Sequence, residues 1–528
     1  MKTQRPQQFR QLEACGLSAV DWLLILLVCV LSIALCVVRS RGRLLWSDEL
    51  FSWNLLNDPS FRHMMAGWNL GADSGGVMYY LLARPWVSVV GLSELNLRLF
   101  STIGMMVAVV FVWISGRRYY STPAVAFGVA LVFFTIPAIL WQDVTGRFYG
   151  LLLGSVAFAS LMFLRTADKA DLPWTDLLAT ALASALVCGS HILGIVYSAS
   201  LLLAAIALDR VRGRWRPGLY LATIAGWLVL PLSYHAIVAT TSVTSTAFWT
   251  QKPTWGTLLF ATVGYSKPIR DVVVVLGLFV VSGRFFRNRR TTFSAESSDR
   301  MSVYALAAGL FFAVLILFVK SRLEGVSIFA DRYLLPLSLA TALILADLVT
   351  RVLPTQRRYP KSIAAAATLF IAVCAVYAFT HPFYAATFPT IGLPQRIEAR
   401  LPPDHTVVVR GLPLYLFLTH YDKTHRYIYL IDWKYDLAPQ RAGAAHGAER
   451  VLENTDRAGY YNHTIQTCDQ IMQQNPSFTF LMLGANEDWI RTRLLTPSYR
   501  TESFGSFTEW FPFTIWHTQR LGPVLPCQ

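Results

Sequence analysis

The chain has 528 residues, of which 54% are hydrophobic and 15% are charged, and its mean hydropathy is +0.43. This composition excludes an ordinary soluble enzyme of the same length and indicates a polytopic membrane protein, because the bilayer must be the main solvent for so much apolar surface. The formal net charge of +15 does not indicate a nucleic-acid partner, because Lys and Arg fall in short loops between apolar runs.

Apolar runs that reach or approach about 20 residues, the length that crosses a hydrocarbon core, follow one another along most of the chain. They predict a mainly α fold of about eleven transmembrane helices, near residues 19–38, 98–115, 124–140, 148–164, 175–189, 192–208, 218–236, 270–283, 302–319, 333–350 and 362–380. We expect these helices to form one membrane domain over residues 1–384.

Basic residues are concentrated in alternate loops between these predicted helices. The basic loops contain Arg117 and Arg118, Arg165 and Lys169, the arginines of 210–216, the arginines of 284–290, and Arg351, Arg357, Arg358 and Lys361. The positive-inside rule places these loops and the N-terminus in the cytoplasm of a multi-pass inner-membrane protein. Segments 39–97, 141–147, 189–191, 237–269, 320–332 and 381–528 are then extracytoplasmic.

The chain changes character beyond residue 384, where polar residues and prolines become frequent. Short β-type runs at 406–410, 427–431 and 478–483 predict a small α/β domain over 385–528 on the periplasmic side. This tail contains Cys468 and Cys527, and an extracytoplasmic location permits a disulfide between them or leaves both as free thiols.

Two adjacent carboxylates, Asp48 and Glu49, follow the first predicted helix at the membrane boundary. One interpretation is structural: Ser47 or Asp48 begins an interfacial helix, where acidic side chains are favoured in the first turn. The other is catalytic, because a carboxylate near apolar surface has a raised pKa and is suited to act as a general base.

The next predicted outer turns bring further polar residues to the same side. Asp143 and Arg147 lie in the second turn and His191 in the third. Charged side chains at a membrane boundary commonly extend toward water, and a histidine between helices is commonly a packing residue, so each has a structural alternative to a role in chemistry.

Cations on the outer side run against the positive-inside bias. Later outer segments contain Lys252, Lys267, Arg270, Lys320, Arg322 and the run Asp331-Arg332-Tyr333. A lipid phosphate would explain such cations, because arginine binds phosphate through two parallel hydrogen bonds and lysine binds it as a point charge. Contact with anionic lipid headgroups is the alternative.

A series of motifs resembles the GT-C superfamily of membrane glycosyltransferases, in particular the bacterial branch related to protein O-mannosyltransferases and to the lipid A aminoarabinose transferase. The matching residues are Asp48-Glu49, Asp73, Tyr79-Tyr80-Leu81-Leu82, Gly91-Leu92-Ser93-Glu94 with Arg98, Arg147 with Tyr149, His191, and Arg332-Tyr333-Leu334-Leu335-Pro336. The chain departs from the family at Gly75-Gly76-Val77-Met78, where the family has Pro-Pro-Leu and where glycines predict a more mobile loop. It also departs at Thr145, where the family places its second acid, which leaves the equivalence of Asp143 open.

The resemblance implies transfer of a sugar, with inversion, from an undecaprenyl-phosphate donor to a cell-envelope acceptor at the outer face of the inner membrane. The acceptor is lipid A, a lipopolysaccharide core sugar, another surface glycan or a protein. Asp48 would be the base, with Glu49 and Asp143 orienting a substrate. The lipid phosphate would be bound by residues among Arg147, Tyr149, His191, Lys267, Arg270, Arg332 and Tyr333, and Asp73, Tyr79 and Tyr80 would position the acceptor or the loop.

Three questions stay open from the sequence. Asp48 and Glu49 are a possible pair of ligands for a divalent ion. The chain is alternatively a transporter or flippase of lipid-linked substrates, although no repeat relates its two halves and its polar candidates gather at one face and not at mid-bilayer. A glycan- or peptide-binding module on a membrane anchor is the third class, and it leaves Asp48, Arg147 and Arg332 without a role.

Overall fold

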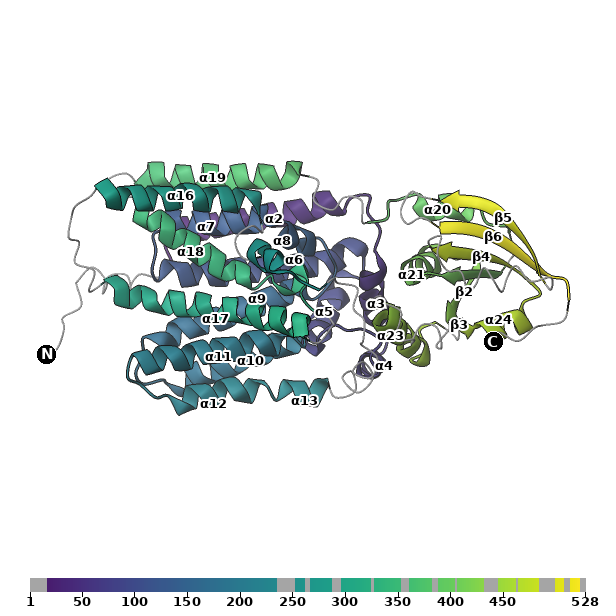
Figure 1. Ribbon diagram of the computed structural model, residues 1–528, viewed down its shortest axis with the longest axis horizontal. Helices are drawn as coiled ribbons and strands as arrows, with labels where there is room; N and C mark the ends of the chain where they lie inside the picture. The colour runs from purple at the N-terminus through teal and green to yellow at the C-terminus, as the bar shows by residue number, and fades with distance from the viewer. Residues whose placement is uncertain are drawn as a thin grey trace.

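The computed structural model describes residues 17–234, 252–261, 266–286, 296–323, 327–352, 360–381, 388–403, 406–431, 445–461, 464–483, 499–507 and 513–522. A bundle of helices forms one end of the molecule and an α/β domain forms the other (Figure 1). The predicted domain boundary at residue 384 lies outside the described residues.

Every predicted apolar run overlaps a helix of the bundle. The bundle helices are α2 Ala19–Ser40, α6 Glu94–Arg117, α7 Thr122–Thr135, α8 Pro137–Asp143, α9 Tyr149–Ala167, α10 Trp174–Ser190, α11 Gly194–Val211, α12 Pro217–Gly226, α13 Val229–Ser233, α15 Trp255–Leu259, α16 Lys267–Phe286, α17 Glu296–Leu323, α18 Leu337–Val352 and α19 Pro360–Thr380. By length and composition, five described helices are able to cross a membrane, or six if the bent pair α7–α8 is one span. The mainly α, multi-pass fold is thereby confirmed.

The run predicted as one helix over 124–140 is two helices that meet at an angle of 72°. Ile136 has extended backbone between them, with φ −78° and ψ 115°. The cause is Pro137, which lacks an N–H group and disfavours helical backbone at the residue before it. The prediction of one continuous helix was therefore wrong, and α8 runs at a steep angle to α7.

Segment 39–97, which is predicted to be extracytoplasmic, contains three helices, α3 Ser47–Leu56, α4 Phe61–Asn69 and α5 Val77–Val90. The apolar helix α5 was not among the eleven predicted runs. Gly76 precedes α5, and a Cβ atom there would lie 2.2 Å from the carbonyl oxygens of Gly189 and Ser190. Close backbone approach thus explains this glycine, where the sequence had pointed to mobility.

The end of the bundle with the basic loops is joined by ion pairs between helix termini. Arg216 pairs with Asp209 at 2.8 Å, and Arg212 pairs with Asp168 at 3.1 Å. Arg216 also donates to the carbonyl oxygen of Thr166 at the end of α9. These contacts fix the ends of α9 and α11 together, and they lie at the opposite end from the polar residues discussed below.

The α/β domain has one six-stranded sheet of order β3-β2-β1-β4-β6-β5. Its strands are β1 Thr406–Arg410, β2 Arg426–Ile431, β3 Ile465–Thr467, β4 Ser477–Leu483, β5 Tyr499–Phe507 and β6 Phe513–Arg520. The first four spatial neighbours are parallel, and β6 and β5 complete the sheet in antiparallel pairs. Helices α20 Leu393–Glu398, α21 Leu412–Tyr421, α23 Ala445–Arg457 and α24 Cys468–Gln474 accompany the sheet. The three strands predicted from sequence are β1, β2 and β4.

The α/β domain is bound directly to segment 39–97 of the bundle. The hydroxyl of Tyr421 donates to Glu94 Oε1 at 2.5 Å and accepts from the backbone N–H of Leu45 at 2.8 Å. Thr455 donates to the carbonyl oxygen of Ala72, and Asn54 donates to the hydroxyl of Tyr461. Helices α21 and α23 therefore lie against the loops that carry the acidic motif (Figure 1).

Cys468 is disulfide-bonded. Cys527, its predicted partner, lies outside the described residues, so the pairing of these two cysteines stays a prediction.

Candidate active site

Five segments far apart in the sequence meet at the end of the bundle that faces the α/β domain. They are the first turn of α3, the loop before α5, the turn between α8 and α9, the residues between α10 and α11, and the short 3-10 helix η2 Asp331–Tyr333. Each segment is a helix terminus or a connection between helices. This placement explains how one polar cluster forms at the end of an apolar bundle without charged groups at mid-bilayer.

Asp48 and Arg332 form an ion pair that remains open to solvent. Arg332 Nη1 lies 3.2 Å from Asp48 Oδ2, and the Asp48 side chain is 33% exposed. Burial lowers the pKa of Arg332, but Tyr149, Tyr333 and Asp48 raise it more, so the net pKa is raised and the guanidinium stays charged. An accessible carboxylate thus stands beside a fixed positive charge.

Arg147 is fully enclosed and binds Asp73 through two parallel hydrogen bonds. The Nη1–Oδ2 and Nη2–Oδ1 distances are 2.8 and 3.0 Å. Nη1 also donates to the Ser52 hydroxyl and to the carbonyl oxygen of Asp48, both at 2.7 Å. Burial lowers the pKa of Arg147, and the charges of Asp73 and Asp48 outweigh that effect and raise it. Arg147 therefore fixes the backbone that presents Asp48.

Asp73, Tyr79 and Tyr80 belong to the same buried assembly as Arg147. Tyr80 donates its hydroxyl to Asp73 Oδ2. Tyr79 donates to the carbonyl oxygen of Gly146 at 3.0 Å and so holds the turn that precedes Arg147. All three side chains are buried, which makes them supports of the site rather than surfaces that meet a substrate.

Aromatic rings surround the Arg332 guanidinium. Its central carbon lies 5.7 Å from the ring centroid of Tyr149 and 5.2 Å from that of Tyr333. His191 contacts Tyr333 and stacks on Phe148, with centroid distances of 5.3 and 5.0 Å. These rings limit the directions that the guanidinium can take, and cation–π contact stabilises its charge.

His191 is a neutral member of this aromatic group. Burial, together with Arg332 and Arg147, lowers its pKa to about 3. Its Nδ1 accepts from the backbone N–H of Leu193 at 3.0 Å, so the neutral ring holds its proton on Nε2. His191 is therefore a hydrogen-bond donor without charge.

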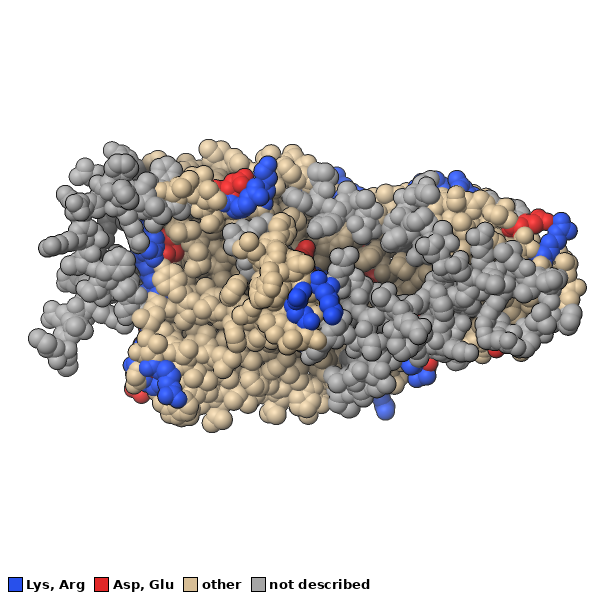
Figure 2. All heavy atoms as spheres, viewed as in Figure 1, with Lys and Arg blue, Asp and Glu red and all other residues tan. Residues whose placement is uncertain are grey.

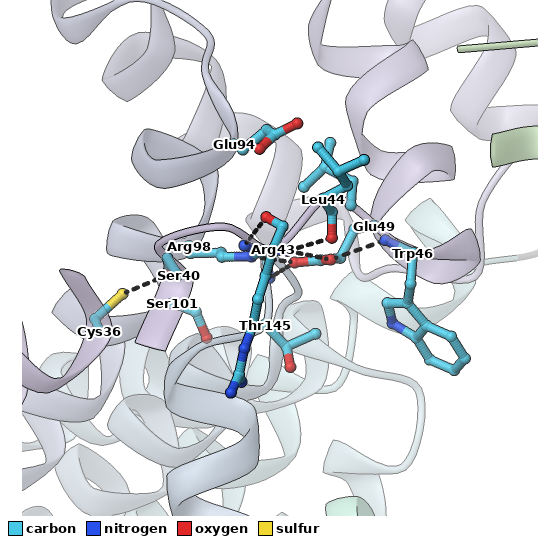
Figure 3. Close-up of polar contacts among 12 residues, drawn as sticks. Cys36, Ser40, Arg43, Leu44, Trp46, Glu49, Glu94, Arg98, Ser101 and Thr145 are labelled. Carbon is cyan, nitrogen blue, oxygen red and sulfur yellow. Dashed lines mark hydrogen bonds and ion pairs between the residues drawn. The ribbon is translucent and has the colours of Figure 1, made fainter. Parts of the chain in front are cut away.

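Glu49, in contrast to Asp48, is fully buried and fully paired. Its two oxygens accept from Arg98 Nε and Nη2 at 3.0 and 3.1 Å. Oε1 also accepts from the backbone N–H of Gly146 at 2.7 Å, and Oε2 from that of Trp46 at 3.1 Å. Figure 3 shows Arg98 reaching from α6 toward Glu49 and the carbonyl groups of residues 43 and 44. Glu49 is placed to hold the start of α3 and does not face open space.

Among the described residues, no hydrogen bond or ion pair joins the Asp143 side chain to Asp48 or Arg332. Its neighbours are Arg39 and Cys36 of α2, with which it interacts electrostatically. Asp143 is buried, and its Oδ1 has no hydrogen-bond partner in the described structure. The described electrostatic contacts of this predicted acid are thus with α2 and not with Asp48.

The remaining predicted cations lie outside the cluster. Lys267 and Arg270 are exposed in the first turn of α16, and Arg270 pairs with Asp271 at 3.1 Å. Neither is joined to Asp48, Arg147 or Arg332 by a hydrogen bond or ion pair within the described ranges. Figure 2 shows other basic side chains where the C-terminal end of α17 lies, which is the end that holds Lys320 and Arg322.

The predicted pair of metal ligands does not fit a shared ion. Both oxygens of Glu49 are occupied by Arg98 and by backbone N–H groups, and Asp48 lies beside Arg332. Among the described residues, no group of three or more His, Cys, Asp or Glu side chains is arranged to hold a metal.

Ser52, Phe148 and Arg98 were not among the predicted site residues, although Arg98 was part of a motif. Ser52 lies one helical turn after Asp48, on the same face of α3, so i,i+4 spacing was the available signal. Phe148 lies between Arg147 and Tyr149 of the predicted Arg-x-Tyr motif. Phe148 contacts Arg147, its neighbour in sequence, whereas its stacking on His191 depends on tertiary packing.

No family model and no curated protein matches the sequence. Solved structures do match. ArnT from Cupriavidus metallidurans in the apo state aligns with a TM-score of 0.59 at 12% identity, over 93% of this chain and 97% of that one. ArnT bound to undecaprenyl phosphate aligns with a TM-score of 0.57 at 12% identity, over 94% and 98%.

A third structure is the archaeal oligosaccharyltransferase AglB from Archaeoglobus fulgidus, solved with an inhibitory peptide and a dolichol-phosphate. Its TM-score of 0.46, at 12% identity over 88% of this chain and 69% of that one, is too low to bear on the fold. ArnT is the lipid A aminoarabinose transferase, a member of the GT-C superfamily. The chain therefore has the fold of ArnT along nearly its whole length, as the resemblance of its motifs predicted.

Proposed function

We propose that this protein is a glycosyltransferase that moves a sugar, with inversion, from a polyprenyl-phosphate donor to a cell-envelope acceptor. The acceptor is lipid A or another part of lipopolysaccharide, another surface glycan, or a protein. The reaction takes place at the outer face of the inner membrane, where the α/β domain would be periplasmic. One observation carries the proposal: an accessible carboxylate, Asp48, lies 3.2 Å from a charged arginine that aromatic rings surround.

Asp48 is the base in this proposal. It takes the proton from the acceptor hydroxyl or amine as that atom bonds to the anomeric carbon of the donor sugar. The bond between that carbon and the phosphate oxygen breaks, and the lipid phosphate leaves with the electron pair. Because a phosphate is already a good leaving group, the protein supplies mainly a base, positioning and positive charge.

Arg332 stabilises the departing phosphate. A guanidinium matches phosphate oxygens through two parallel hydrogen bonds, and Arg332 is partly exposed, with 19% of its side chain accessible. The Nε2–H of His191 and the hydroxyl groups of Tyr149 and Tyr333 are further candidate donors. Arg147 cannot release Asp73 without leaving a buried charge unpaired, so we assign it the role of positioning Asp48 through the backbone.

The fold likeness supports the choice of donor. ArnT has been solved bound to undecaprenyl phosphate, and this chain aligns with that structure over 94% of its length. A lipid phosphate bound at the outer end of the bundle would place its charged group near Arg332 and its tail in the bilayer.

The test is incubation of the full-length protein in lipid nanodiscs with a panel of polyprenyl-phosphate sugars and cell-envelope acceptors. Mass spectrometry measures the free polyprenyl phosphate and the glycosylated product. We expect sugar-dependent release with the wild type and its loss with Asp48→Asn, which keeps the shape of the side chain but removes the base. The control is Glu502→Gln, because Glu502 is 53% exposed on β5 and far from the site in the chain.

Equal release by Asp48→Asn and the wild type would overturn the assignment of the base. Absence of release from every donor, with the wild type folded and an acceptor present, would overturn the transferase and favour the transporter or flippase, which a flux assay with the same lipids then measures.

A further inference from the structure

The turn that follows α2 carries cations at the level where two lipid-facing helices end. α2 has 22 residues, about 33 Å of helix, which is enough to cross a hydrocarbon core, and α19 packs against it. The exposed apolar side chains of these two helices include Leu23, Leu26, Val30 and Val38 of α2 and Leu369, Val373 and Val376 of α19. Arg39, Arg41 and Arg43 come directly after Val38. The turn is therefore placed where lipid headgroups meet the protein.

Arg39 joins the ends of the two helices. Its Nη2 donates to the carbonyl oxygen of Ala378 and, at 2.7 Å, to that of His381, at the end of α19. Its side chain is buried and also interacts with Asp143. The guanidinium of Arg39 thus holds α2 and α19 together, so the exposed faces of both helices lead to the same turn.

Arg43 is partly exposed, and its guanidinium is not joined to an acid. Its central carbon lies 5.8 Å from the ring centroid of Phe388, and that of Arg98 lies 5.0 Å from the same ring. In the described structure its side-chain nitrogens make no hydrogen bond or ion pair, and none of them is sealed from solvent. Figure 3 draws no contact at this guanidinium, which lies away from Glu94. Arg43 therefore has hydrogen-bond donors available on an aromatic support.

The charges around Arg43 favour an anion. Burial, and then the charge of Arg98, lower the pKa of Arg43. Glu49 accepts from Arg98, and Glu94 accepts from Tyr421, so both acids have other partners. A half-buried guanidinium beside a second guanidinium is stabilised by an anion that accepts two parallel hydrogen bonds.

We propose that Arg43, with Arg41, binds the phosphate of an anionic phospholipid whose acyl chains lie along the exposed faces of α2 and α19. A guanidinium matches two phosphate oxygens, and the exposed Arg41 adds a second positive charge at headgroup level. The apolar faces that lead to the turn favour a lipid over a soluble anion. This site is separate from Asp48 and Arg332 and does not depend on the transfer reaction.

The direct test is native mass spectrometry of the full-length protein in mild detergent, titrated with dioleoyl phosphatidylglycerol. We expect the wild type to bind one lipid more tightly than the rest. Arg43→Gln should weaken that binding about ten-fold, because it removes a charged pair of hydrogen bonds. Arg43→Lys should weaken it less, because lysine keeps the charge and loses only the fork. Arg41→Gln should weaken it about five-fold or less, the effect of one cation near a headgroup.

Arg210→Gln is the matched control. Arg210 is an exposed cation in the last turn of α11, at the other end of the bundle, and its loss should leave the tight binding unchanged. Equal weakening by Arg210→Gln and Arg43→Gln would mean that basic surfaces attract anionic lipid in general, and it would overturn the site. Unchanged binding in both Arg43 variants, with thermal unfolding showing that they are folded, would overturn it as well.

Two further probes separate a lipid from free phosphate. Dioleoyl phosphatidylcholine, which has a phosphate but no net charge, should bind more weakly than the anionic lipid. Inorganic phosphate at millimolar concentration should not displace the anionic lipid, because it has no acyl chains to cover α2 and α19. Inorganic phosphate that binds as tightly as the lipid, and only when Arg43 is present, would overturn the lipid as the ligand.

Discussion

Asp48 and Glu49 are neighbours in the first turn of α3, yet they lie in opposite kinds of environment. Glu49 is 0% exposed and accepts hydrogen bonds from Arg98, Gly146 and Trp46. Asp48 is 33% exposed, and its described side-chain partner is Arg332. We call these the closed pair, Glu49 with Arg98, and the open pair, Asp48 with Arg332.

The comparison distinguishes a carboxylate that stabilises the fold from one that is able to react, when the two are adjacent in sequence. A buried carboxylate whose oxygens are all occupied has no lone pair left for a proton or a substrate, and removing either partner leaves a buried charge. A partly exposed carboxylate with a single partner exchanges that partner at low cost. We therefore expect the open pair to govern activity and the closed pair to govern stability.

The largest effect is expected at the open pair itself. Asp48→Asn should lower the rate of transfer by about 10²- to 10⁴-fold, the usual contribution of a general base. The melting temperature should change little, because an exposed ion pair contributes at most about 1 kcal/mol. Product formation by mass spectrometry and thermal unfolding in nanodiscs measure the two quantities. A large loss of stability with retained activity would reverse the roles of the two pairs.

The closed pair should respond in the opposite way. Arg98→Met should lower the free energy of unfolding by about 3–5 kcal/mol, because it leaves the buried Glu49 carboxylate without its main partner. The double variant Glu49→Leu with Arg98→Met should recover much of this loss, because no unpaired charge remains. Chemical unfolding in mild detergent measures both. An unchanged stability in Arg98→Met would contradict the assignment of the closed pair.

Arg332→Ala tests whether Arg332 acts on the lipid-linked donor or on the acceptor. Loss of one charged hydrogen-bond donor should lower kcat/KM for the lipid-linked sugar by about ten- to a hundred-fold. The KM for the acceptor should stay within about two-fold, because the acceptor meets Asp48. Steady-state kinetics with each substrate varied in turn gives both values. A rise in acceptor KM alone would move Arg332 out of the donor site.

The closed pair continues into the α/β domain through Glu94, which accepts from Tyr421. Tyr421→Phe removes a hydroxyl that also serves the Leu45 N–H, so it should lower the free energy of unfolding by about 1–2 kcal/mol. Tyr499→Phe is a control of the same chemistry, because Tyr499 lies on β5 of the sheet. An equal loss of stability in the two variants would show that the hydrogen bonds of Tyr421 with Leu45 and Glu94 make no specific contribution.

The smallest effect is a pH dependence of the free energy of unfolding, and it arises from His420 of α21, which contacts Trp53 of α3. Burial, with Lys423, lowers the pKa of His420 to about 4, below the ordinary value of about 6.5. The unfolded chain therefore binds more protons between these values, and the stabilisation by neutral His420 is present above pH 6.5 and lost as pH falls toward 4. Between pH 7 and 6 the loss should be less than about 1 kcal/mol.

His420→Gln should flatten this slope. Thermal unfolding at matched ionic strength across pH 7 to 5 measures it, and an unchanged slope in the variant would mean that His420 is not the titrating group.

Much of the fold follows from the sequence. Apolar length is a local property, so the runs at 19–38, 148–164 and 302–319 predict helices that the structure contains. The motif residues Asp48, Arg147, His191 and Arg332 were assigned to one face by loop charge alone, and the structure brings them to one end of the bundle.

What the sequence could not determine is the direction of each side chain. Adjacent positions differ by about 100° around a helix, so Asp48 and Glu49 face different neighbours. The sequence does not show that Glu49 pairs with Arg98 of α6 and that Asp48 pairs with Arg332 of η2. Asp143 interacts with Arg39 of α2, and it ends the helix that follows the bend at Pro137. The order of the helices and the position of the charged residues at helix ends follow from the local pattern of hydrophobicity. The separation into closed and open pairs arises only from packing, because burial and hydrogen-bond partners come from residues distant in the chain.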